Sequence, residues 1–124
     1  LYRDGHACER WNMLHPADTA RVSHVAHCLK ATEGPVIAAT DYIRAFAEQI
    51  RPYVPRRYVV LGTDGFGRSD TREKLRHFFE VDRWYISVAA LKALADEGTL
   101  PVAKVGEAIA KYGLDPAKPA PWTV

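Results

Sequence analysis

The 124-residue sequence has little of what several protein classes require. Two cysteines are too few for a secreted miniprotein held together by several disulfides. No apolar run is long enough to cross a membrane, so no membrane association is expected. The net charge of +2 is too small to favour nonspecific phosphate binding, and no nucleic-acid partner is predicted. What remains is the composition of one globular domain, with 48% hydrophobic and 26% charged residues.

Common catalytic and metal-binding motifs are also absent. There is no G-x-S-x-G nucleophile elbow and no Cys-x-x-Cys pair. Six candidate metal ligands fall in the first 28 residues, at spacings that match no common zinc module: His6, Cys8, His15, His24, His27 and Cys28. We interpret them as surface histidines and reduced thiols of a cytoplasmic protein, and predict no metal site. His77 and Glu80 are three residues apart on a predicted helix, where acid–base work is conceivable, but we expect solvent-exposed polar side chains.

Two short apolar runs and the segment between them predict a β-α-β unit. Residues 36–39 and 58–61 are rich in β-branched residues and bounded by turn signals, which is typical of parallel strands covered on both faces. Between them, apolar residues recur at helical spacing over 43–50, with Asp41 as the expected N-cap and Pro52 as the stop. The sequence therefore predicts an α/β fold, a mostly parallel sheet with helices on both faces.

The rest of the chain is predicted to be mainly helical. Helices are expected over 21–30, after Asp70, over 84–95 and over 102–112, with Gly98 and Gly113 ending the last two and Pro101 in the first turn of the last. Asp70 and Glu73 have the spacing of a capping box. The first twenty residues show no clear periodicity. The proline-rich tail, residues 115–124, is expected to lie along the surface or to fray.

A glycine-rich segment follows the second predicted strand. It comprises Gly62, Thr63, Asp64, Gly65, Phe66, Gly67, Arg68, Ser69 and Asp70. A loop between strand and helix is the right context for phosphate binding, but the glycines read G-x-x-G-x-G, not the dinucleotide fingerprint G-x-G-x-x-G. The carboxylate of Asp64 would also repel a phosphate. We expect a structural bend at the carboxyl end of the sheet, with a nucleotide-binding α/β domain as an alternative.

Several strings of residues, in one order along nearly the whole chain, resemble a known family. They are residues 3–5 (RDG), 8–16 (CERWNMLHP), 40–42 (TDY), 46–49 (FAEQ), 60–70 (VLGTDGFGRSD), 72–73 (RE), 75–76 (LR), 79–82 (FEVD) and 89–91 (AAL). Together they resemble the C-terminal part of the homodimeric, bacterial-type pyruvate dehydrogenase decarboxylase component. This family uses thiamine diphosphate and has a transketolase-like architecture. Such long strings are far more specific than a glycine motif alone.

The resemblance implies a fold and a place in a longer chain. Residues 1–124 are expected to form a single C-terminal transketolase-like domain, a three-layer sandwich with helices on both faces of the sheet. In the family this domain opens with a strand before the segment that matches Arg3-Asp4-Gly5, so the first strand is expected to be missing here. A chain that begins with Leu1 agrees with that expectation. An exposed strand edge would make the isolated chain self-associate.

The resemblance also implies the parent's reaction. The parent would decarboxylate pyruvate with thiamine diphosphate and Mg²⁺, and then acetylate the lipoyl group of the dihydrolipoyl acetyltransferase component. The family's metal signature is Gly-Asp-Gly followed at a distance by Asn. Thr63-Asp64-Gly65 only superficially resembles it, and Asn12 is the only asparagine. No catalytic, cofactor-binding or metal-binding residue is therefore assigned, and the isolated chain is expected to bind no cofactor and to be inactive.

The expected role of the domain is structural. The loop from Gly62 to Asp70 is expected to face another domain of the parent, because α/β proteins place functional surfaces at this edge of the sheet. The expected partners of the chain are the other domains of the parent and its dimer mate. The alternative is a module that recruits a partner, the acetyltransferase component, through the proline-rich tail. Trp122 would be its anchor, since exposed aromatics often dominate protein contacts.

Overall fold

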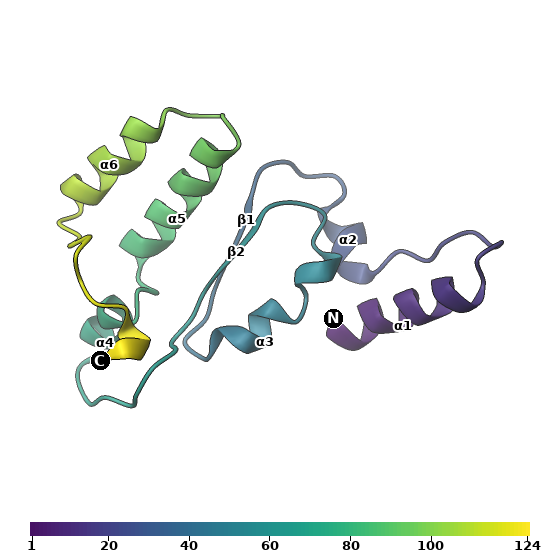
Figure 1. Ribbon diagram of the computed structural model, residues 1–124, viewed down its shortest axis with the longest axis horizontal. Coiled ribbons are helices and arrows are strands. Elements are labelled where there is room, and N and C mark those ends of the chain that lie inside the picture. Colours follow the sequence, from purple (N-terminus) through teal and green to yellow (C-terminus); the bar gives the residue numbers. More distant parts are fainter.

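Two short parallel strands lie at the centre of the computed structural model, which describes residues 1–124 (Figure 1). The elements are α1 (Tyr2–Leu14), α2 (His24–Leu29), β1 (Val36–Ala39), α3 (Arg44–Glu48), the 3-10 turn η1 (Arg51–Tyr53), β2 (Tyr58–Leu61), α4 (Arg72–Phe78), α5 (Arg83–Asp96), α6 (Val102–Lys111) and the 3-10 turn η2 (Pro121–Thr123). None of the helices combines the length and the apolar character that crossing a membrane requires.

The strands pair in parallel, with Val36 opposite Tyr58 and Ala39 opposite Leu61. Helix α5 packs against both strands and α3 packs against β2, and Figure 1 shows the two helices on opposite sides of the sheet. The prediction of an α/β fold with parallel strands and helices on both faces is confirmed. The sheet itself has two strands.

The main hydrophobic core lies on the side of α2 and α3. It consists of five buried residues, with Leu29, Ala47 and Ile50 packed around them: Val25, Tyr53, Val54, Tyr58 and Val60. Because side chains alternate along a strand, Tyr58 and Val60 enter this core while Val59 and Leu61 face α5. The Tyr58 hydroxyl donates to the carbonyl of Ala47 at 2.8 Å, and burial raises the pKa of Tyr58.

The crossover helix differs from its prediction in two ways. It begins at Arg44 with Ile43 as N-cap, so the prediction that Asp41 caps it was wrong. Asp41 instead pairs with guanidinium groups of α4, which are stronger partners than a backbone amide. The helix is also only five residues long, and Phe46, whose spacing places it on the apolar face, is 56% exposed.

Helix ends elsewhere follow the predicted chemistry with small shifts. Gly98 and Gly113 have φ values of 76° and 65° directly after α5 and α6, as predicted for helix-ending glycines. The N-cap of α4 is Thr71, whose hydroxyl accepts from the amide of Lys74, while Asp70 accepts from the amide of Thr71. Asp70 is therefore one residue too early to be the N-cap. Pro101 is the N-cap of α6 and not a residue of its first turn.

Helix α1 is the element for which the sequence shows no signal. Gly5 is its buried residue, and a Cβ built there would lie 2.3 Å from the ring of Tyr53. Asp4 accepts from the first amide of α2, that of His24, at 2.7 Å. The helix is thus held by contacts with residues far along the chain.

We predict opposite effects of alanine at two helical glycines. Gly5→Ala should lower the free energy of unfolding by about 1–3 kcal/mol, because the added methyl meets the buried Tyr53 ring. Gly106→Ala in α6 should raise it by about 0.5–1 kcal/mol, because nothing lies within 4 Å of its Cβ position and alanine favours helix. Urea unfolding followed by circular dichroism measures both. Equal effects of the two substitutions would contradict the packing of α1 on Tyr53.

Candidate functional site at the carboxyl edge of the sheet

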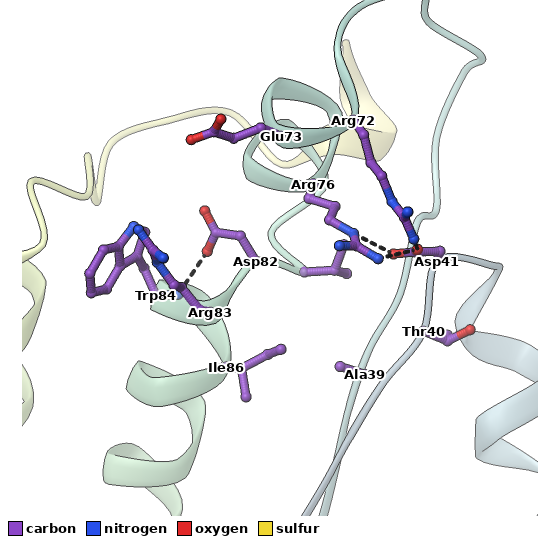
Figure 2. A pocket seen from close by; sticks show the side chains of 11 residues that line it. Ala39, Thr40, Asp41, Arg72, Glu73, Arg76, Asp82, Arg83, Trp84 and Ile86 are labelled. Atoms are coloured by element: carbon purple, nitrogen blue, oxygen red, sulfur yellow. Dashed lines mark hydrogen bonds and ion pairs between the residues drawn. The ribbon is translucent and has the colours of Figure 1, made fainter.

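Both strands end at one edge of the sheet, where open α/β folds place their ligands and functional loops. The chain after β1, the glycine loop after β2, helix α4 and the start of α5 meet there. Figure 2 shows one cleft at this edge, lined by the segment after β1, by α4 and by the start of α5. Two clefts open at this edge, of about 810 Å³ and 500 Å³. They share three lining residues, Asp41, Arg72 and Arg76.

An ion pair between Asp41 and α4 separates the two clefts. Arg76 donates to both oxygens of Asp41, from Nε at 3.1 Å and from Nη2 at 2.6 Å, and Nη2 of Arg72 lies 3.6 Å away (Figure 2). The hydrogen bonds from Arg76 hold the pKa of Asp41 below its ordinary value of 3.8. The pair therefore ties the end of β1 to α4 at neutral pH.

The first half of the glycine loop is bound to the segment after β1. The amide of Thr63 donates to the carbonyl of Tyr42 at 2.9 Å. Asp64 accepts a hydrogen bond from the first amide of α3, that of Arg44, at 3.2 Å. Its carboxylate therefore binds the free amide that Asp41 was predicted to cap. A Cβ on Gly62 would lie 2.9 Å from the Tyr42 carbonyl oxygen and 2.6 Å from the Arg44 side chain. Gly62 thus allows a close backbone approach, and the segment is a structural bend.

Exposed aromatic side chains surround this bend. Phe66, at the tip of the loop, is 71% exposed. Tyr42 and Phe46 are also exposed, and their rings lie 5.2 Å apart. The edge therefore presents an apolar surface next to the Asp41–Arg76 ion pair. Sequence periodicity predicts Phe46 on the buried face of its helix, and this prediction is wrong.

Comparison with known proteins places this edge inside a family. Residues 7–82, which include both strands, the glycine loop and α4, match the model of the transketolase-like TK C-terminal domain. The chain belongs to this family. Curated relatives of this domain, all called pyruvate dehydrogenase E1 component, are 72% identical over 124 residues in Cupriavidus necator, 60% over 122 in Pseudomonas aeruginosa and 55% over 122 in Escherichia coli K12. These matches cover 98–100% of the chain and 14% of each relative's length.

The transketolase-like domain does not fit a magnesium or diphosphate site at its glycine loop. Asp64 is the residue of the Thr63-Asp64-Gly65 string whose side chain could bind magnesium. One of its oxygens accepts from the Arg44 amide and the other lies 3.8 Å from Nε of Arg44. Nowhere in the domain do three His, Cys, Asp or Glu side chains come together in a way that could hold a metal ion.

The histidines and cysteines of the first two helices do not gather at one place, and each of the contacts below involves a different pair of side chains. Nε2 of His24 lies 3.3 Å from Sγ of Cys28 on α2. On α1, His15 stacks on Trp11 at 4.4 Å, and Nδ1 of His6 lies 3.9 Å from Glu9. Cys8 is a free thiol, partly buried on α1.

His77 and Glu80 are not brought together in the transketolase-like domain. Nδ1 of His77 lies 2.8 Å from Asp82, which caps α5 by accepting from the amides of Trp84 and Tyr85. Glu80 has a φ of 62° and its carboxylate pairs with Lys118. Asp82 was missed by the sequence reasoning, although an Asp directly before an apolar helical stripe is an N-cap signal.

We predict that the Asp41–Arg76 pair stabilises the domain only above the pKa of Asp41. A lowered carboxyl pKa contributes stability above the ordinary value of 3.8, and the contribution is lost as pH falls through the lowered value. Asp41→Asn should reduce the melting temperature at pH 7 by a small amount, on the order of 2 °C, because the pair is half exposed. The difference from wild type should disappear in acid.

The matched control is Asp18→Asn, since Asp18 makes no ion pair in the structure. Melting is followed by circular dichroism from pH 7 to a pH below the lowered pKa of Asp41. A deficit of the Asp41 variant that persists or grows in acid would refute the role of the pair.

Proposed function

We propose that this chain is a domain of a pyruvate dehydrogenase E1 component. The observation that carries the proposal is 72% identity over all 124 residues to a relative of that name. The relatives extend well beyond the match, since it covers 14% of their length, so the activity is assigned to a longer parent protein.

The parent is proposed to be a cytoplasmic homodimer that decarboxylates pyruvate and acetylates the lipoyl group of the dihydrolipoyl acetyltransferase component. Thiamine diphosphate with Mg²⁺ would supply the carbanion chemistry. The residues of this domain do not fit that cofactor, because Asp64 is committed to Arg44. We therefore place the cofactor and the catalytic groups in other parts of the parent.

The domain itself is proposed to support assembly of the parent. Its glycine loop, residues 62–70, would meet another domain of the parent or the dimer mate. Three features support this: the loop is fixed to the Tyr42–Arg44 segment, it presents Phe66 to solvent, and Arg68 has no ion-pair partner within the domain. An exposed aromatic ring beside a guanidinium without an ion-pair partner suits a protein contact, because aromatic and Arg side chains are enriched where proteins bind.

A chimera tests the assignment. Residues 1–124 replace the matching segment of the Cupriavidus necator E1 component, and pyruvate oxidation is measured with the acetyltransferase component present. We expect activity of the same order as the unmodified enzyme. An inactive chimera that still folds and dimerises would count against the proposal.

The same chimera tests the loop. Phe66→Ser should reduce activity or dimer affinity about tenfold, as expected when an aromatic contact is truncated at an interface. Val102→Ser is the matched control, because Val102 is 66% exposed on α6 outside both clefts. If the two variants behave alike, the loop does not face another part of the parent.

A second candidate function, recruitment of the acetyltransferase component by the tail, is favoured by one observation. Trp122 is 54% exposed although its neighbour Pro121 is fully buried, so an anchored segment presents the indole. Trp122→Ala in the full-length parent should then weaken capture of the acetyltransferase component about tenfold without changing pyruvate decarboxylation. If the Trp122→Ala parent captures the acetyltransferase component as well as the wild type does, recruitment by the tail is rejected. Support of the parent's own assembly is then the remaining role of the domain.

A further inference from the structure

The last segment of the chain lies against the glycine loop. Pro121 is fully buried, and its carbonyl oxygen is 2.7 Å from the position of a Cβ on Gly65. Gly65 has a φ of 137°, which L side chains rarely adopt, so both its conformation and its neighbour require glycine. Figure 1 shows the C-terminus beside α4, at the same end of the molecule as the loop.

Lys118 anchors this segment from the other side. Its ammonium donates to the carbonyl of Phe78 at 2.7 Å and to Oε1 of Glu80 at 2.8 Å, and its side chain is only 20% exposed. The Phe78 carbonyl belongs to the last turn of α4, where a helix leaves acceptors unpaired. The tail is thus bonded to the turn between α4 and α5.

The second half of the glycine loop has few other constraints. Thr63 and Asp64 are bonded to the segment after β1, but no backbone hydrogen bond involves an amide of residues 65–69. Apart from the tail, two rings of the α4 end lie beside this half. The guanidinium of Arg68 is 4.0 Å from the centre of the Phe78 ring, and the Phe79 ring lies beside Gly65. Phe78 is also the residue whose carbonyl accepts from Lys118.

We propose that residues 115–124 act as a clamp that fixes residues 65–69 of the glycine loop, with Lys118 and Pro121 as the positioning residues. The clamp keeps Phe66 and Arg68 in the orientation in which they meet a partner surface. Loosening the tail would release the loop tip while the strands and the α3 contacts stay in place. That these side chains meet a partner surface rests on the proposed function, whereas the fixing of the loop by the tail does not.

Backbone dynamics of the full 124-residue chain test the clamp. In wild type, ¹⁵N relaxation should give order parameters near ~0.85 for Gly65, Phe66 and Gly67, the value of rigid backbone. Lys118→Met should lower them below about 0.6, the range of flexible loops, while Thr63 remains ordered. Trypsin should also cleave after Arg68 about tenfold faster, as loss of a charge-assisted hydrogen bond allows.

The matched control is Lys104→Met, which removes the same charge from an exposed lysine paired with Glu107 on α6. Circular dichroism verifies that each variant is folded. If Lys118→Met does not fold, the same measurements are made on Pro121→Ala, which removes the buried ring. A loop that stays as ordered as in wild type, or that loosens equally in the control, overturns the proposal.

Discussion

The close approach of Gly62 to the Tyr42–Arg44 segment is the constraint on which the carboxyl edge depends. Two strands of four residues each form a small sheet, and a further link joins the chain beyond their carboxyl ends. The Thr63 amide and the Asp64 carboxylate supply that link by bonding to Tyr42 and Arg44. A side chain at position 62 would collide with the same backbone, so the link requires glycine there.

Helix α4 and the C-terminal tail are joined to this edge by further contacts. Asp41 reaches across to Arg76, which fixes α4 relative to β1. The turn after α4 holds Lys118, and the tail covers Gly65. At this edge Asp41 is paired with Arg72 and Arg76. Glu73, Arg83 and Arg68 make no ion pair, and Phe66 exposes its ring. Such a surface suits contact with another protein more than it suits catalysis.

The sequence predicts those parts of the fold that local residues decide. Both strands follow from β-branched runs between turn signals, and the ends of α5 and α6 follow from Gly98 and Gly113. The glycines after the second strand also predict the bend that begins at Gly62. These features depend on a few neighbouring residues.

The features that the sequence does not predict depend on distant partners. Helix α1 packs through Gly5 on the ring of Tyr53, and the tail is held by the hydrogen bond from Lys118 to Glu80. The role of Asp41 changed because Arg76, 35 residues away, is a stronger partner than a nearby amide. Phe46 lies within α3 and is nevertheless exposed, and no pattern of apolar residues records which face of a helix its neighbours will cover.

The most direct test of this account is a structure of the assembled full-length protein that contains this domain. We expect the glycine loop to keep the conformation described above, with Phe66 buried against another domain or the dimer mate. A structure of the complete assembly in which Phe66 and Arg68 still face solvent would contradict the central claim that this edge is a contact surface.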